Sequence, residues 1–356
     1  MRPAQARIDL AALRHNLARV RACAPAAGVV AMVKANGYGN GAARLLPALH
    51  AADRLGVACL EEALVLRAAG ARQPIVLIEG VFSADELAAC GAHGLEIVVH
   101  EQGQIAMLEQ AAPAEPLALW LKIDTGMTRL GLAPGAVHDA YHRLKRRSRS
   151  ITLTSHFACA DEPDNSMTRA QIARFDAVCA GLEGARSLAN SAGVLAWPAS
   201  HRDHVRPGIM LYGASPMIGH TGADDGLLPV MTLQTGVVAL KDIPAGTSVG
   251  YGATWTAAQA SRIAIAAIGY GDGYPRHAPS GTPVLVNGQR AGLAGRVSMD
   301  LIAIDVTGLA DVAIGDPVTL WGEGLPVEEV AEAAGTIAYE LLCGVTQRVP
   351  VSTAGP

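Results

Sequence analysis

Short apolar runs alternate with amphipathic stretches along the first two-thirds of the chain. Eight runs of aliphatic and β-branched residues predict buried strands, at 29–34, 54–60, 74–80, 95–100, 117–124, 151–157, 187–191 and 205–212. Stretches with helical spacing lie before and between them, among them 10–24, 61–69 and 84–93. This alternation over about two hundred residues favours a closed (β/α)8 barrel, of the TIM type. A doubly wound open sheet is the alternative, and it is disfavoured because no strand is followed by a G-x-G-x-x-G turn.

Two of the helical stretches begin with N-terminal signals. Asp9 precedes 10–24 and is predicted to cap it, because an aspartate side chain accepts hydrogen bonds from the free amides of a first helical turn. Ser83 and Glu86 have the spacing of a capping box before 84–93. Both patterns predict where a helix begins.

The pattern changes after residue 220. Residues 219–226 form a polar, glycine-containing linker, and short β-rich runs follow it, at 230–240, 262–269, 283–286, 291–306 and 317–321. One helix is predicted among them, at 327–334. The sequence therefore predicts two domains, an α/β barrel at 9–222 and a C-terminal mostly-β domain at 223–356. Residues 1–8 are expected to join the second domain.

Composition and charge exclude several classes of protein. Half of the 356 residues are apolar, enough for a sizeable core, and the formal charge of −4 argues against a nucleic-acid binder. The one basic stretch, 142–149, is interpreted as a solvated helix end. No apolar run is long enough to span a membrane, and the first residues lack a signal-peptide core. The six cysteines lack metal-site spacing, so we expect reduced, mostly buried thiols in a cytoplasmic protein with no metal.

Lys34 is the strongest candidate for chemistry. It closes the predicted strand 29–34 and stands directly before a loop rich in glycine. Dehydration at the mouth of a buried strand disfavours the ammonium form, so such a lysine becomes neutral and nucleophilic. A neutral lysine can hold an aldehyde cofactor as a Schiff base. The alternative is a lysine that reaches water from a strand end, with an ordinary glycine turn after it.

Other polar residues stand at or near the ends of predicted strands, where the chemistry of (β/α)8 barrels gathers. With Lys34, they are Lys122, Arg129, His156, Asn190, Ser191 and Arg206. Each alone could equally cap a helix or form a salt bridge. Because all of them converge on one rim, the sequence predicts a catalytic site there.

Tyrosines are the commonest aromatic residues of the chain, and most of them stand in unusual places. Five lie beside glycines or in the β-rich region: Tyr38, Tyr251, Tyr270, Tyr274 and Tyr339. This placement indicates hydroxyl donors in loops rather than packing. An aromatic at a sheet edge is the alternative for Tyr274.

Seven motifs carry a resemblance to a known family. They are VKANGYGNG at 33–41, HFACAD at 156–161, NS at 190–191, VRPGIMLYG at 205–213, GYGATW at 250–255, IGYGDGYPR at 268–276 and GRVSMD at 295–300. With these motifs, the chain resembles the bacterial, pyridoxal-phosphate-dependent alanine racemases over essentially its whole length. The resemblance implies a barrel that carries the cofactor lysine, followed by a β domain.

The resemblance also implies a cofactor, a reaction and an assembly. Lys34 would hold pyridoxal 5'-phosphate, and Lys34 and Tyr251 would be the two bases that exchange the α-proton of alanine. Tyr251 would come from the partner subunit, so the active unit would be a homodimer with shared sites. The substrate would be a small amino acid, and the product D-alanine a peptidoglycan precursor. Arg206 would face the pyridine nitrogen of the cofactor, which favours racemisation over transamination.

The remaining roles also come from the resemblance, motif by motif. Cofactor binding would fall to Tyr38, His156, Asn190, Ser191, Arg206, Gly208, Ile209 and Tyr339. Arg129 would bind the substrate, Met299 matches a residue that the partner subunit supplies near the substrate, and Lys122 matches a lysine that is often carbamylated. A narrow access corridor would be lined by Asp161, Tyr270, Arg276, Arg296 and Ile337.

Three alternative functions remain open. A racemase with a broader range, including serine, would carry the same motifs. A barrel-type pyridoxal-phosphate decarboxylase would need an acidic residue in place of Arg206, and a non-catalytic cofactor carrier would lack both the β domain and Tyr251. The last two are disfavoured by the residues present.

Overall fold

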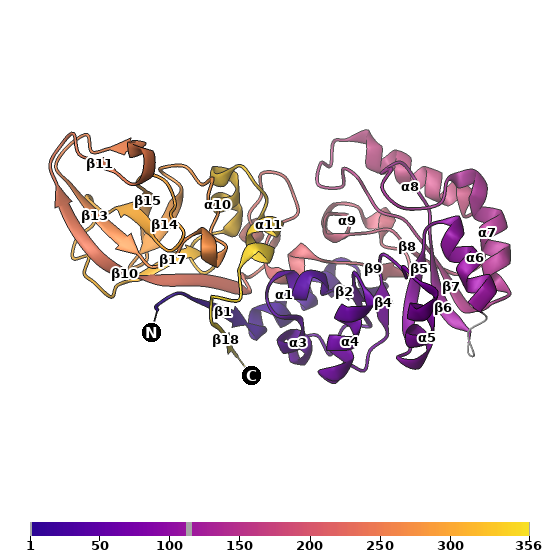
Figure 1. Ribbon diagram of the computed structural model, residues 1–356. Helices are drawn as coiled ribbons and strands as arrows, with labels where there is room; N and C mark the ends of the chain where they lie inside the picture. The colour runs from indigo at the N-terminus through magenta and orange to yellow at the C-terminus, as the bar shows by residue number, and fades with distance from the viewer. Residues whose placement is uncertain (1, 112–115, 356) are drawn as a thin grey trace. The chain divides into compact units, whose positions relative to one another are not determined.

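The computed structural model describes residues 2–111 and 116–355, and the chain divides into two compact units (Figure 1). The β unit comprises Met1–Leu13, Tyr212–Ser215 and His220–Pro356. The barrel unit comprises Arg14–Leu211 and Pro216–Gly219. The first strand of the chain therefore belongs to the unit that is otherwise built from the C-terminal part.

The barrel unit is built on eight parallel strands in the order β8-β7-β6-β5-β4-β3-β2-β9. They are β2 (Gly28–Met32), β3 (Arg54–Val57), β4 (Ile75–Leu77), β5 (Leu95–Val99), β6 (Leu117–Lys122), β7 (Ser148–Thr154), β8 (Ala185–Ser187) and β9 (His204–Val205). Backbone hydrogen bonds from Asp203 N–H to Arg186 O and from Arg206 N–H to Ala189 O join the β9 segment to the β8 segment. The sheet is thereby closed, and the predicted (β/α)8 class is confirmed.

Helices alternate with these strands, as expected for parallel pairing. They are α1 (Leu10–Cys23), α2 (Lys34–Tyr38), α3 (Ala42–Leu45), α4 (Leu60–Ala68), α5 (Ala84–Ala92), α6 (Gln102–Ala111), α7 (Val137–Lys145), α8 (Ser166–Val178) and α9 (Ser191–Ala196). The Asp9 cap is confirmed, since its Oδ1 accepts from Ala11 and Ala12 N–H at 2.8 and 2.9 Å. The capping box at Ser83 is wrong: Ser83 forms no side-chain cap, and Glu86 accepts from Phe82 N–H instead.

The last predicted strand of the barrel, 205–212, is wrong over most of its length. β9 ends at Val205, and residues Ile209–Tyr212 form a 3-10 turn. Pro207 and Gly208 interrupt the apolar run, because proline has no amide hydrogen to donate to a strand ladder. An apolar run with such an interruption is buried without being a strand.

The β unit is a mostly antiparallel sheet in the order β13-β16-β15-β14-β17-β10-β1-β18, and β10 also pairs with β13. Its strands are β1 (Gln5–Asp9), β10 (Met231–Ile243), β13 (Ser261–Ala266), β14 (Pro283–Val286), β15 (Gln289–Leu293), β16 (Ile302–Asp305), β17 (Pro317–Trp321) and β18 (Val351–Ala354). A small ribbon of β11 (Ser248–Val249) and β12 (Trp255–Thr256) stands apart from this sheet. The predicted β class of this unit is confirmed.

Several details of the β unit differ from the prediction. The run 291–306 spans two elements, the end of β15 and the whole of β16. The helix α10 (Val327–Ala334) is confirmed, and a second helix, α11 (Ala338–Gly344), was missed. Within the predicted linker, Gly222–Asp225 form a 3-10 turn that Thr221 and Asp224 cap.

Tyr274 is a core residue rather than a loop hydroxyl donor. It is 1% exposed and stacks on Trp321, with ring centroids 6.1 Å apart.

All six cysteines are free, but only Cys90 and Cys179 are fully buried, so the expectation of mostly buried thiols is wrong. Within the described residues, no helix combines the length and the apolar character needed to cross a membrane.

Candidate functional site

Lys34 begins α2, in a strained turn directly after β2. β2 ends at Met32, so the prediction that Lys34 closes the strand is wrong, and its side chain is half-buried. Ala35 and Asn36 have left-handed backbone angles, with φ of 51° and 53°, which cost about 1 kcal/mol or more each outside glycine. Ala35 N–H donates to Glu62 Oε1 at 2.7 Å and holds the turn. Such strain is typical of functional loops.

Tyr38, Ser191 and Gly208 form a compact group of polar atoms. A Cβ added to Gly208 would lie 2.3 Å from the Tyr38 hydroxyl oxygen, so only glycine permits this approach. Ser191 Oγ accepts from Gly208 N–H at 2.8 Å and from Met210 N–H at 3.4 Å, which leaves its own hydrogen available to donate. Asn190 caps α9 by accepting from Gly193 N–H at 2.9 Å. Ile209, which is buried, begins the following 3-10 turn.

Arg206 is a buried guanidinium, and each of its two terminal nitrogens donates at least two hydrogen bonds. Nη1 donates to Thr154 Oγ1 at 3.0 Å and Ser187 Oγ at 2.5 Å. Nη2 donates to Ser155 O at 2.5 Å and Leu188 O at 3.1 Å. Among the described residues, no acceptor takes a hydrogen bond from Nε–H. Burial lowers the pKa of Arg206 to about 10.

His156 accepts from this arginine. Its Nδ1 lies 3.4 Å from Arg206 Nη2, and because guanidinium can only donate, Nδ1 must be the acceptor and the ring proton must sit on Nε2. Burial, and then the positive charges of Arg206 and Lys122, hold the pKa of His156 well below its usual value of 6.5. His156 is therefore a neutral imidazole with a defined tautomer.

Lys122 and Arg129 add to a concentration of positive charge on this rim. Lys122, at the end of β6, is 8% exposed; burial, and then the charges of Arg206, Arg129 and Lys34, lower its pKa to about 8. Arg129 is exposed and follows Thr128, a β-branched residue with φ of 57°. The barrel unit thus brings Lys34, Lys122, Arg129, His156 and Arg206 into one electrostatic neighbourhood, as the rim argument predicted.

One residue that links these loops was missed by sequence reasoning. Gln171, on α8, is fully buried and donates from Nε2 to Thr125 Oγ1 at 3.2 Å and His156 O at 2.9 Å. Its Oε1 accepts from Ala158 N–H at 3.0 Å. It therefore ties the loop after β6 to the loop after β7. A single polar residue on a helix has no sequence signature that would have revealed this role.

The other predicted residues are divided between the units. Asp161 is half-buried and lies in the barrel unit. The β unit holds Tyr251, Tyr270, Arg276, Arg296, Met299, Ile337 and Tyr339, all of them exposed. Tyr251 has 69% of its surface exposed, the largest fraction among the exposed large hydrophobic side chains of the described residues.

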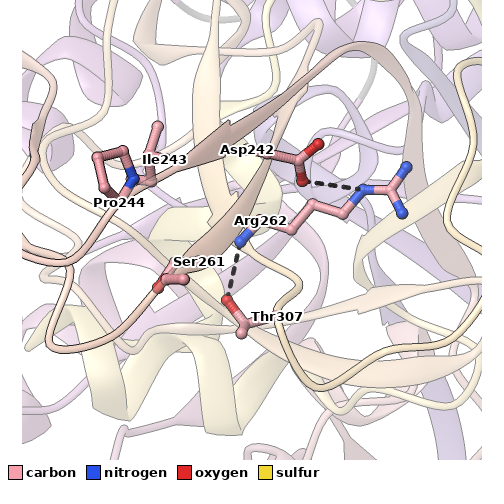
Figure 2. A pocket seen from close by; sticks show the side chains of 7 residues that line it. Asp242, Ile243, Pro244, Ser261, Arg262 and Thr307 are labelled. Carbon is pink, nitrogen blue, oxygen red and sulfur yellow. Dashed lines mark hydrogen bonds and ion pairs between the residues drawn. The ribbon is translucent and has the colours of Figure 1, made fainter.

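A separate hollow in the β unit does not contain any of these residues (Figure 2). It is an open depression of about 400 Å³, and its lining includes Asp242, Arg262 and Thr307. Arg262 Nε lies 3.9 Å from Asp242 Oδ1, a long and exposed ion pair. The barrel rim, and not this hollow, therefore carries the candidate site.

Comparisons with known proteins identify the family. The sequence profile described as "Alanine racemase, N-terminal domain" matches residues 8–216, and "Alanine racemase, C-terminal domain" matches residues 230–353. The chain is similar to the alanine racemase of Azoarcus sp. (strain BH72), with 55% identity over 98% of this chain and 99% of that one.

The chain belongs to the alanine racemase family.

Solved structures of the alanine racemase family agree with this fold. The biosynthetic alanine racemase from Pseudomonas aeruginosa is 49% identical, covers 100% of both chains and superposes with a TM-score of 0.97. An alanine racemase from Bartonella henselae with covalently bound pyridoxal phosphate is 30% identical, covers 99% of both chains and gives a TM-score of 0.90. The resemblance stated from the seven motifs is confirmed.

Proposed function

We propose that this protein is an isomerase that interconverts L-alanine and D-alanine with pyridoxal 5'-phosphate held on Lys34. The observation that carries the proposal is the buried Arg206, whose Nε–H has no acceptor among the described residues. The Nε atom itself keeps some accessible surface, so its hydrogen is a donor that a ligand acceptor can reach. A pyridine nitrogen is such an acceptor.

The other donors around this rim fit the same cofactor. The Ser191 hydroxyl retains its hydrogen, and the Tyr38 hydroxyl approaches the backbone at Gly208 where no side chain would fit. Hydroxyls and backbone amides are the donors that a phosphate uses when no lysine or arginine binds it. We propose that Tyr38, Ser191, Gly208, Ile209 and Tyr339 hold the phosphate. We also assign His156 and Asn190 to the cofactor site.

Two bases on opposite faces of the substrate are needed for racemisation. The bound cofactor serves as an electron sink that makes the α-proton of the amino acid removable. The Lys34 amine would take or return that proton on one face, and the Tyr251 hydroxyl would act on the other. Arg206 can only donate, so it would leave the pyridine nitrogen of a bound cofactor without a proton and would keep the ring a weak electron sink. This favours return of the proton to the α-carbon.

We propose that Tyr251 acts in the site of a partner subunit, in a homodimer with shared sites. Tyr251, Met299 and Ile337 are at least half exposed in the isolated chain, and exposed apolar side chains of this size indicate an interface. The barrel domain, 9–222, would then carry the cofactor lysine, and the β domain, 223–356 with residues 1–8, would supply the tyrosine. The six free cysteines support a reducing, cytoplasmic setting.

Substrate selection would depend on two parts of the site. Arg129 would bind the substrate carboxylate, and Lys122, with its lowered pKa, would react with carbon dioxide to form a carbamate that orients Arg129. Met299 would contact the substrate. Asp161, Tyr270, Arg276, Arg296 and Ile337 would line the access corridor, which would favour a small side chain.

The test is a racemisation assay on the purified holoenzyme with alanine, serine and arginine as substrates. We expect conversion of alanine in both directions and a visible cofactor absorbance that Lys34→Ala abolishes and Lys145→Ala, on the surface of α7, retains. Comparable rates with serine would favour the broader racemase. Decarboxylated products would overturn the proposal.

Tyr251→Phe tests the second base. Removing the hydroxyl should suppress solvent-deuterium incorporation from one alanine enantiomer by about a hundredfold or more, because only one face loses its base. Incorporation from the other enantiomer should persist. Undiminished exchange from both enantiomers would remove Tyr251 from this role.

A further inference from the structure

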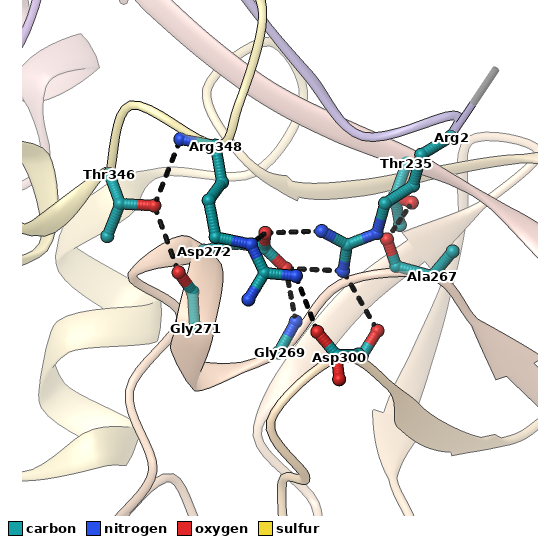
Figure 3. Close-up of polar contacts among 9 residues, drawn as sticks. All are labelled: Arg2, Thr235, Ala267, Gly269, Gly271, Asp272, Asp300, Thr346 and Arg348. Atoms are coloured by element: carbon teal, nitrogen blue, oxygen red, sulfur yellow. Dashed lines mark hydrogen bonds and ion pairs between the residues drawn. The ribbon is translucent and has the colours of Figure 1, made fainter.

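Asp272 is a fully buried carboxylate that the proposed chemistry does not use (Figure 3). Arg2 Nη1 and Nη2 donate to its two oxygens at 2.5 and 2.6 Å, and Arg348 Nε lies 3.6 Å from Oδ1. Arg348 Nη2 also donates to Asp300 Oδ1 at 2.5 Å, and Arg2 Nη2 to Asp300 O at 3.0 Å. Two arginines and two aspartates thus form one network without net charge, which we call the Asp272 network.

The Asp272 network joins three loops of the β unit. Tyr270 N–H donates to Ser298 O at 3.0 Å, and Gly271 N–H donates to Met299 O at 2.9 Å. Thr346 N–H donates to Asp272 O at 3.0 Å. The packing is tight, since a Cβ on Gly271 would lie 2.2 Å from Arg348 Nη1. The loops at 269–273, 298–300 and 344–348 therefore hold one another in a single arrangement.

Two exposed side chains, Tyr270 and Met299, belong to the loops that this network holds in place. Tyr270 is 40% exposed and Met299 is 52% exposed, although each directly adjoins or lies within two residues of the network. Burying charges has a large desolvation cost, which hydrogen bonds of good geometry must offset. Loops that only connect strands do not need a buried network of charges to hold them in one conformation. The network fixes the loops whose backbones carry Tyr270 and Met299, which indicates that the placement of these two side chains matters.

We propose that the Asp272 network positions Tyr270 and Met299 as one wall of the substrate site, and so sets substrate affinity and the preference for a small side chain. Asp272 is a positioning residue in this account, because it acts through Tyr270 and Met299 and does not touch the substrate. The inference rests on the proposed function, which assigns Met299 and Tyr270 to the site and its access corridor.

Asp272→Asn tests the network while it keeps the shape of the side chain. In the holoenzyme, we expect the KM for alanine to rise about tenfold with kcat changed less than about threefold, since a misplaced wall weakens binding more than chemistry. The preference for alanine over serine, as a ratio of kcat/KM values, should fall. Arg7→Ala is the matched control. Arg7 lies on β1 in the same N-terminal segment, and it pairs with the exposed Glu323. It should leave KM and the preference unchanged.

Three further variants keep the test decisive if Asp272→Asn does not fold. Arg2→Ala should reproduce the rise in KM, and Arg2→Lys should restore part of it because it keeps the charge. Gly271→Ala should displace the Arg348 guanidinium and give the same effect without removing any charge. The visible cofactor absorbance should be unchanged in all of them.

The outcomes separate the two proposals. A wild-type protein that racemises alanine, together with variants that lose only thermal stability and keep KM and substrate preference, would overturn the positioning role. A wild-type holoenzyme that does not racemise alanine would overturn the proposed function and this inference with it.

Discussion

Lys122→Met should stabilise the protein at neutral pH, although it removes a residue of the proposed site. The ammonium of Lys122 is buried among positive charges, and its pKa falls from 10.5 to about 8. At 1.36 kcal/mol for each pKa unit, this corresponds to about 3 kcal/mol of destabilisation when the folded protein must hold the charged form. Methionine has a similar length and no charge to bury.

The pH dependence of this effect has a definite sign. Below pH 8 Lys122 is protonated in both the folded and the unfolded states, so the destabilisation is fully present. As pH rises through 8, the folded protein loses this proton and the destabilisation shrinks, and above 10.5 both states are neutral and it is gone. The difference between wild type and Lys122→Met should therefore be largest below pH 8 and should close toward pH 10.5.

Calorimetry of the holoenzyme in buffer free of carbon dioxide is the assay. With about 2.1 cal/mol/K of unfolding entropy per residue, 3 kcal/mol corresponds to a rise in Tm of about 4 °C for 356 residues. Bicarbonate should raise the Tm of wild type and not that of Lys122→Met, because a carbamate would replace the buried cation by an anion beside Arg129 and Arg206. Lys145→Met, on an exposed lysine paired with Glu183, should change Tm little. A Lys122→Met protein no more stable than wild type at pH 7 would refute this reasoning.

Two other predictions concern the cofactor rim. Gly208→Ala should weaken pyridoxal phosphate binding by about tenfold or more, because its Cβ would collide with the Tyr38 hydroxyl. Titration of the apoprotein with the cofactor measures this loss. Gly91→Ala on α5 is the control and should not weaken binding, because a Cβ there meets nothing within 4 Å. The His156 ring should stay neutral between pH 6 and 8, since its pKa lies well below 6.5. Its Cε1–H NMR resonance should therefore not move over that range. A titration with a midpoint above 6 would contradict its buried contact with Arg206.

The barrel was predictable because parallel strands buried on both faces are continuous apolar runs. β5 and β6 are buried at every residue and, apart from Glu96 and Lys122, both are apolar throughout. Strand ends were less predictable, because an apolar run continues beyond the ladder wherever the chain stays buried. The 3-10 turn Ile209–Tyr212 is an example. The helix α11 was missed because seven residues are too few to show a helical period.

The sequence predicted which residues gather on the barrel rim, but it did not predict the hydrogen bonds that those residues make. The rule that chemistry gathers at strand ends selected Lys34, Lys122, His156 and Arg206, and all four lie in the barrel unit. Besides His156, the partners of Arg206 are two hydroxyls and two backbone carbonyls from β7, β8 and the loops after them, and such groups carry no motif. The tautomer of His156 follows only from that arrangement.

The position of β1 has a consequence for how the chain is made. β1 lies between β10, to which it is antiparallel, and β18, to which it is parallel. A ribosome delivers β1 first and both of its neighbours about two hundred residues or more later, so the nascent strand has no ladder to join while the barrel emerges. A C-terminal fragment that begins after the barrel would lack β1, so β10 would gain a bare edge and β18 would lose the one strand it pairs with in the described sheet, which leaves both open to pairing with other chains. We expect such a fragment to aggregate unless the segment Gln5–Asp9 is supplied as a separate peptide.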